Sequence, residues 1–125
     1  MAMQYVKIRA DRIKEISLSD GTDDFVLAGT GSGFNTFSTA CQGGDRFDYA
    51  ITHPGTSDWE TGVGIYDDLT NTVIRSEITA SSNNNAKVSF GSGSKQIFIT
   101  VNSQSLADYD RTLVRATALS IALGY

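Results

Sequence analysis

Hydrophobic and polar residues alternate most regularly in two neighbouring stretches near the middle of the chain, residues 45–51 and 59–66. Successive side chains of a strand point to opposite faces, so this alternation predicts two half-buried strands. Turn-forming residues at 53–58, including Pro54 and Gly55, lie between them and predict an antiparallel hairpin at the core of the fold. The core side chains expected from this hairpin are Phe47, Tyr49, Ile51, Trp59, Val63 and Ile65.

Shorter strand-like runs lie on both sides of this hairpin, separated by clusters of Gly, Ser, Asn and Asp. They cover residues 4–9, 11–18, 24–29, 34–41, 72–79, 87–90 and 96–101. The alternation slips once at Lys14 and Glu15, which is typical of a β-bulge. About eight or nine short strands at this spacing predict an all-β fold, an antiparallel β-sandwich or a jelly-roll-like barrel.

This pattern divides the chain into three segments. Residues 1–10 are expected to form an N-terminal strand or arm, residues 11–101 the β-domain, and residues 102–125 a C-terminal helix or arm. In the last segment, apolar residues recur at helical spacing but also occupy the remaining circumference, so one face of a β-domain would not cover them all. We therefore expect this segment to make subunit contacts through Leu113, Val114, Leu119, Ile121 and Leu123.

Composition and charge narrow the class of protein. The 125 residues are 40% hydrophobic and carry a net charge of −4, which suits one folded domain. The ten Lys and Arg residues are scattered, whereas a protein that binds nucleic-acid backbone needs them clustered, so no nucleic-acid partner is expected. The single cysteine, Cys41, excludes an internal disulfide and predicts a buried, inert thiol.

The N-terminal residues and the overall hydropathy bear on where the chain is made. Residues 1–9 contain no apolar core of a signal peptide. No stretch approaches 18 consecutive apolar residues, the length associated with a membrane-spanning helix. We therefore expect the chain to fold in the cytoplasm in which it is made, with no membrane partner.

The residue types that carry catalysis do not form a recognisable set. The only histidine, His53, stands in the Pro54 turn and is interpreted as a loop residue. Paired carboxylates occur at 23–24 and 67–68, but without the spacing of a calcium loop. Trp59 lies between two acidic residues, as in a sugar-stacking platform, although a core position is favoured. No catalytic, cofactor-binding or metal-binding residue is predicted.

Several motifs, kept in order over residues 11–100, give the chain a resemblance to a β-domain of tailed-bacteriophage virion proteins. That family has the pattern D-R-V-K-E, a G-T-G-x-F-x-L-A-G turn, G-F, G-D-x-x-x-Y-x-I, W-E-x-G-x-G-x-Y, A-S-S-N and V-x-F-x-x-G-x-K-x-V-F-x-T. The matching stretches here are 11–15, 24–29, 33–37, 44–51, 59–66, 80–83 and 88–100. The turn at Thr22 and Asp23 departs from the pattern, residues 41–44 are shortened, and residues after Val101 lie outside it.

The resemblance implies a structural, non-enzymatic module of head decorations, tail tips or fibre attachments. Together with the apolar C-terminal segment, it predicts a virion structural protein, a capsid decoration or head/tail attachment protein. We expect a symmetric homo-oligomer, a trimer, that binds other virion proteins such as the major capsid or tail proteins. The alternatives are a receptor- or glycan-binding module of a tail tip or fibre, and an enzyme such as a depolymerase acting through paired carboxylates.

Overall fold

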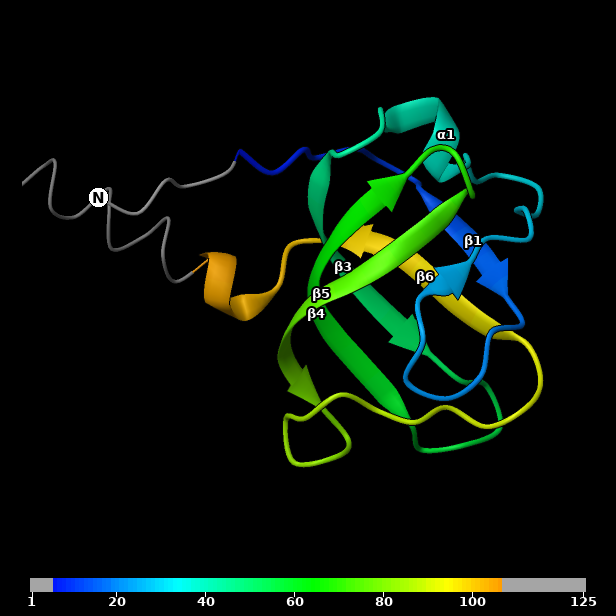
Figure 1. Ribbon diagram of the computed structural model, residues 1–125, viewed down its shortest axis with the longest axis vertical. Coiled ribbons are helices and arrows are strands. Elements are labelled where there is room, and N and C mark those ends of the chain that lie inside the picture. The colour runs from blue at the N-terminus through cyan, green and yellow to red at the C-terminus, as the bar shows by residue number, and fades with distance from the viewer. Residues whose placement is uncertain (1–5, 107–125) are drawn as a thin grey trace, which may run out of the picture.

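Six antiparallel strands form one sheet in the computed structural model, which describes residues 6–106 of the chain (Figure 1). The strands follow the order β1-β6-β3-β4-β5-β2 across the sheet. The elements are β1 (Lys14–Ser17), β2 (Phe25–Val26), α1 (Phe37–Ala40), β3 (Arg46–Thr52), β4 (Trp59–Asp67), β5 (Thr72–Ser81) and β6 (Lys95–Thr100). The predicted central hairpin is confirmed as β3 and β4, in which Thr52 pairs with Trp59 next to the turn.

The sheet curves into a nearly closed barrel because the chain after β2 bridges its two edges. On one side, the Leu27 amide donates to the Asn71 carbonyl oxygen at 3.0 Å. On the other side, the Ala28 amide donates to the Ile16 carbonyl oxygen, and the Ile16 amide donates to the Gly29 carbonyl oxygen. These hydrogen bonds occupy the backbone groups that an open edge would expose. The all-β prediction is confirmed, in its barrel form.

The described chain has six strands, fewer than the eight or nine predicted. Of the predicted strands at 4–9 and 87–90, the described residues 6–9 and 87–90 contribute only isolated bridges, Lys7 with Arg46 and Phe90 with Gly21. The predicted strand at 34–41 is wrong, because Phe37–Ala40 forms the short helix α1. The predicted bulge at Lys14 is also absent, since β1 pairs with β6 in continuous register. The register shifts instead between β4 and β5.

The barrel interior is filled mainly by aromatic rings. Phe47, Tyr49 and Ile51 of β3 are fully buried, which confirms their predicted place in the core. The rest of the core cluster comes from every part of the barrel: Ile13, Phe25, Leu27, Phe37, Cys41, Tyr66, Val73, Val88, Phe90 and Ile97. Cys41 is a free, buried cysteine, as the sequence predicts.

The prediction for the inner face of β4 is wrong at Trp59. The strand turns Glu60, Gly62, Gly64 and Tyr66 to the buried side, whereas Trp59 is 41% exposed. Ile65 is only half-buried. Val63 is buried but lies outside the main core cluster, opposite Asp48 in the β3–β4 register.

Two glycines explain this orientation of β4. A methyl group on Gly62 would stand 2.8 Å from the Tyr49 hydroxyl oxygen, and one on Gly64 would stand 2.9 Å from the Phe47 ring. Atoms that close overlap, so the inner face of β4 has no side chains where the β3 rings occupy the space. The aromatic residues of β3 and the glycines of β4 therefore form one packing unit.

Segments from both ends of the described chain lie against the outside of β3. The Lys7 ammonium lies 3.2 Å from the buried Asp48 carboxylate and donates to the Ser105 hydroxyl at 2.7 Å. Residues 103–106 are helical, and the Asn102 side chain caps them by accepting the Ser105 amide at 2.9 Å. The predicted interface residues Leu113, Val114, Leu119, Ile121 and Leu123 lie outside the described residues. Between residues 6 and 106, no helix has the length and apolar character needed to cross a membrane.

Candidate functional site

The most polar cluster in the barrel interior is centred on Glu60 and Arg75. Arg75 Nη2 lies 2.5 Å from Glu60 Oε1, and Arg75 Nε donates to Glu60 Oε2 at 2.8 Å. The Tyr49 hydroxyl donates to Glu60 Oε2 at 2.7 Å, and the Val88 amide donates to Glu60 Oε1 at 2.8 Å. Burial first, and then the Glu60 carboxylate, raise the pKa of Tyr49 well above its ordinary value. Each Glu60 oxygen thus accepts two hydrogen bonds.

The remaining donors of Arg75 are also used. Its guanidinium donates to the carbonyl oxygens of Gly21, Asp23 and Val88 at 2.7–3.2 Å. The rings of Phe25 and Phe90 lie about 5 Å from its central carbon. A buried ion pair with all its hydrogen bonds made fixes the geometry around it. This cluster has the contacts of a structural network, with no donor left for a ligand.

Two further buried charges hold loops onto the barrel. The Glu15 carboxylate accepts the Gly29 amide at 3.0 Å and the Phe37 amide at 2.8 Å. The Lys95 ammonium donates to Asp20, to the Gly91 carbonyl oxygen and to the Gly93 carbonyl oxygen, all within 2.9 Å. Three acceptors match the three donors of an ammonium group. These charges are therefore part of the scaffold.

His53 and the acidic pairs do not assemble a reactive site. His53 is buried at the end of the β3–β4 hairpin, with its ring 6.3 Å from the Phe90 ring. Asp24 accepts the Arg75 backbone amide, and Asp67 accepts the Leu69 amide. In the part of the chain that the structure describes, no three His, Cys, Asp or Glu side chains are grouped as metal ligands would be.

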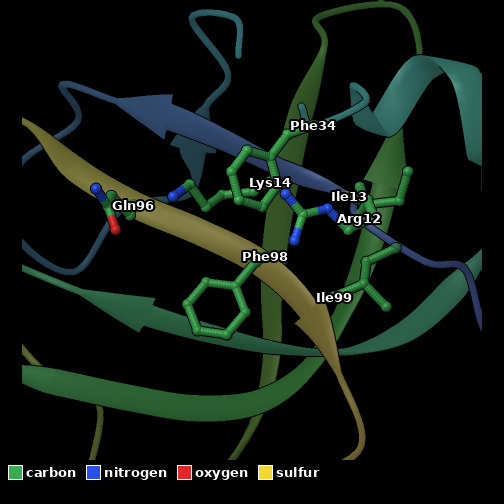
Figure 2. A pocket seen from close by; sticks show the side chains of 7 residues that line it. All are labelled: Arg12, Ile13, Lys14, Phe34, Gln96, Phe98 and Ile99. Carbon is green, nitrogen blue, oxygen red and sulfur yellow. The ribbon is translucent and has the colours of Figure 1, made fainter. Parts of the chain in front are cut away.

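The outer face of β1 and β6 carries a groove with a different character (Figure 2). Figure 2 shows Arg12, Lys14 and Phe34 grouped beside β1, with Gln96 and Phe98 on the neighbouring strand β6. Strand pairing creates this arrangement, because Lys14 lies directly opposite Phe98 in the β1–β6 register. The groove, about 350 Å³ in volume, is lined by Arg12, Ile13, Lys14, Phe34, Gln96, Phe98 and Ile99.

Two cations share one aromatic ring in this groove. The Arg12 guanidinium carbon lies 4.1 Å from the centroid of the Phe34 ring, and the Lys14 ammonium lies 4.2 Å from it. Among the described residues, no carboxylate lies within ion-pair distance of either cation. The attraction between a cation and a ring places both charges, but it does not neutralise them. The groove is therefore a local positive site on an acidic protein.

The backbone at Arg12 is in an unusual conformation. Its φ is +61°, and the other described non-glycine residues with positive φ are the asparagines Asn71, Asn84 and Asn85. Asparagine tolerates this left-handed region, whereas a long side chain is disfavoured there. Hydrogen bonds on either side hold it: the Asn35 amide donates to the Arg12 carbonyl oxygen at 2.7 Å. The Arg12 Nε also donates to the Gly33 carbonyl oxygen at 2.9 Å.

Apolar surface continues from the groove along β1. Ile16 follows Lys14 on the outer face and is 39% exposed, and the next outward residue, Leu18, is 64% exposed. A second hollow, lined by Lys14, Glu15, Ile16, Phe34, Gln96 and residues 30–32, joins this surface to the groove. The outer face of β1 thus changes from basic at Arg12 to apolar at Leu18 within seven residues.

Sequence reasoning missed this groove. Its signal was local alternation, which puts Arg12 and Lys14 on one side of their strand and Gln96 and Phe98 on one side of another. Only the pairing of β1 with β6 makes these two pairs neighbours. Comparison of the chain with protein-family models, curated proteins and solved structures finds no match. Function is therefore inferred from the residues and their geometry.

Proposed function

We propose that this chain is a structural protein of a bacteriophage virion, a capsid decoration or head/tail attachment protein that acts by binding other proteins and not as an enzyme. The observation that carries the proposal is the division of its charged groups. Internal hydrogen bonds and ion pairs occupy the buried charged groups, which are Glu15, Glu60, Arg75 and Lys95. By contrast, the charges of Arg12 and Lys14, which have no carboxylate partner, lie in an outward-facing groove. A scaffold with an outer docking face suits an attachment role.

The motifs behind the resemblance to phage virion β-domains support this proposal, because they have structural roles in the barrel. The stretch 11–15 supplies Glu15, which ties two loops together. The stretch 59–66 supplies Glu60 for the ion pair and glycines that admit the β3 rings. The stretch 88–100 supplies Lys95, which closes the loop before β6. The resemblance therefore rests on residues that specify the scaffold which a structural, non-enzymatic module needs.

We further propose that the protein acts as a symmetric homo-oligomer, a trimer. The argument rests on the apolar sequence of residues 107–125, which lie outside the described residues. Cyclic symmetry lets identical apolar segments bury one another. The partners of such an oligomer are virion proteins, the major capsid or tail proteins, with no nucleic-acid or membrane partner. The chain would be made in the cytoplasm of a bacterial host and incorporated into the particle.

Two measurements test this proposal. Electron microscopy of purified particles should place a symmetric set of copies of this barrel on the head, the neck or the tail. Light scattering should give the full chain a mass three times its 13.4 kDa. A chain truncated after Leu106 keeps every contact described here and should scatter as a monomer. The same number of chains per particle for the full and truncated chains would remove the assembly role from the C-terminal segment, and absence from purified particles would refute the virion role.

The exposure of Trp59 favours one alternative, a receptor- or glycan-binding module of a tail tip or fibre. Trp59 is 41% exposed at the start of β4, and exposed aromatic rings stack on sugars. The neighbouring Glu60 points into the barrel and is unavailable, so Asp58 is the one flanking acid left at this surface. Titration with a panel of neutral and acidic oligosaccharides, followed by tryptophan fluorescence, tests it directly. A saturable change abolished by Trp59→Ala would favour the glycan-binding function.

A further inference from the structure

We infer that the groove between β1 and β6 binds an extended, acidic and apolar peptide segment of a partner protein. An acidic side chain of this segment would lie beside Arg12 and Lys14, and apolar side chains that follow it would pack on Phe98 and Ile16. The inference deepens the attachment role proposed above, on which its biological meaning rests, by naming the chemistry of the partner. It is carried by the groove's charge, by its aromatic lining and by the backbone of Arg12.

The charge of the groove selects an anion. Arg12 and Lys14 lie against the same ring, and no carboxylate pairs with either of them among residues 6–106. Two cations against one ring, neither paired with a carboxylate, make the local potential positive, so a carboxylate bound beside Phe34 gains from both. The chain as a whole is acidic, with a net charge of −4. This makes the groove a place where an acidic segment would be attracted instead of repelled.

The lining of the groove selects apolar side chains next to the acid. Phe98 and Ile99 lie beside the cations, and Ile16 extends the apolar surface along β1. Residues two apart on one face of a strand are about 7 Å apart, which is also the spacing of alternate side chains in an extended peptide. An extended segment running along β1 would therefore bring its acidic and apolar side chains to Lys14 and Ile16 together.

A nucleic acid fits this surface less well. Binding to a phosphate backbone needs a track of basic groups, and the groove offers two cations followed by Ile16 and Leu18, which are apolar and exposed.

The backbone conformation of Arg12 also supports a binding role for the groove. Left-handed non-glycine residues are enriched at functional sites, and here such a residue carries the guanidinium that lies over Phe34.

The test uses the full chain and a capped hexapeptide that contains two glutamates followed by phenylalanine and isoleucine. Amide chemical shifts are recorded during titration. Shifts should concentrate at Lys14, Gln96 and Phe98, and should saturate with a Kd on the order of 10⁻⁴ M, as for a short flexible ligand. The same peptide with glutamines for glutamates should bind about tenfold more weakly. Raising the salt concentration from about 0.05 to 0.5 M should reduce that difference, because salt screens exposed charges.

Lys14→Glu has a matched control in Lys87→Glu. Both lysines are half-buried and both variants change the net charge equally, but Lys87 lies in the loop after β5, outside the groove. Lys14→Glu should weaken the peptide about tenfold or more, and Lys87→Glu should leave its Kd within about twofold. An equal loss of peptide affinity in both variants would show that only the net charge of the protein matters, and would overturn the groove as the binding site. The melting temperature of each variant shows whether it remains folded.

Arg12→Asn provides a second variant that keeps the backbone conformation. Asparagine accepts a positive φ, so this variant should fold and yet lose binding. Unchanged peptide affinity would show that the guanidinium is not part of the site. Two further probes, a thymidine decanucleotide and an acidic trisaccharide, separate the other occupants: stronger groove binding by either would overturn the peptide assignment. A virion protein whose groove binds no peptide would keep the proposed function and lose only this inference.

Discussion

The guanidinium Nη2 of Arg75 lies 2.5 Å from the Oε1 of Glu60, and neither side chain is exposed to solvent. The pair joins two neighbouring strands of the sheet, since Glu60 is on β4 and Arg75 is on β5. The pair also holds two loops against the barrel, because Glu60 accepts the Val88 amide and Arg75 donates to the Gly21 carbonyl oxygen. One ion pair thus organises the barrel interior and the loops that cover its end.

Removing one partner of this pair should strongly destabilise the fold. Arg75→Met leaves the Glu60 carboxylate buried without its cation, and Glu60→Gln leaves Arg75 buried without its anion. Loss of one member of a buried pair typically costs about 3–5 kcal/mol. The free energy of unfolding, measured by denaturant titration, should fall by that amount in each variant. In the double variant the loss should be smaller than the sum of the two single losses.

Asp20→Asn is the matched control for the buried pair. It removes the carboxylate next to Lys95, but the Asp20 side chain is 58% exposed, and the ammonium keeps two backbone carbonyl oxygens as partners. Exposed ion pairs contribute about 0–1 kcal/mol. A cost for Arg75→Met as small as that of Asp20→Asn would contradict the structural role given to the buried pair.

The glycines on the inner face of β4 should tolerate alanine to different degrees. A methyl group on Gly62 meets the Glu77 backbone carbonyl oxygen and the Tyr49 hydroxyl, whereas one on Gly64 meets only the side chains of Phe47 and Val73. Backbone yields less readily than side chains, so Gly62→Ala should cost about 2–4 kcal/mol and Gly64→Ala about 1–2 kcal/mol. Thermal and denaturant unfolding of the two variants measures this order.

Gly31→Ala is the control for these two substitutions. Nothing lies within 4 Å of a methyl group at this position, and the residue does not have a positive φ. Its stability should therefore change by less than about 1 kcal/mol. If Gly62→Ala behaved like Gly31→Ala, the inner face of β4 would have room that the packing described here does not allow.

The central hairpin was predictable from sequence because its signals are local. Turn residues separate two runs of alternating polar and apolar residues. The large apolar side chains of β3 all lie on one face of that strand, so the sequence alone indicates which face is buried. The orientation of β4 was not predictable in the same way. Its inner face consists of Glu60, two glycines and Tyr66, so the larger apolar residues fall on the outer face. A buried Glu60 makes sense only with Arg75, which lies 15 residues away in the sequence and pairs with it through the fold.

The groove was unpredictable for a related reason. Its cations and its second ring come from strands far apart in sequence, and only the register that sets Lys14 against Phe98 brings them together. Phe34 was assigned to a strand by alternation. In the structure it precedes the short helix α1, whose first amide is held by the buried Glu15. Local patterns located most of the strands, whereas non-local pairing decided which side chains face outward together.

Trp59 should report its exposure spectroscopically. The chain has one tryptophan, and it is 41% exposed, so the native emission maximum should lie nearer that of free tryptophan than that of a buried one. Iodide should quench it in the native state. Trp59→Ala should cost about 1–2 kcal/mol, less than the loss of a fully buried ring, because the backbone contacts with Ser82 remain. A blue-shifted emission that iodide does not quench would contradict this exposure.

Cys41 should make the protein less stable in alkaline solution. Burial, with smaller contributions from the Asp45 and Glu15 carboxylates, raises the pKa of the Cys41 thiol from 9.0 to about 12. The unfolded thiol therefore releases its proton at lower pH than the folded one. Above pH 9, deprotonation favours the unfolded chain, so stability is full below about pH 9 and falls as the pH rises toward 12.

The Cys41 contribution can be separated from that of other groups by the slope of stability against pH. Tyr49 has a raised pKa as well and also lowers stability at high pH. Cys41→Ala should therefore reduce the slope between pH 9 and 11 without abolishing it, whatever its effect on absolute stability. At pH 8 the native thiol should resist iodoacetamide and react once the chain is unfolded in urea, because the thiolate is the nucleophile. Rapid alkylation of the native protein, or an unchanged slope in Cys41→Ala, would show that the pKa of the Cys41 thiol in the folded protein lies near its ordinary value.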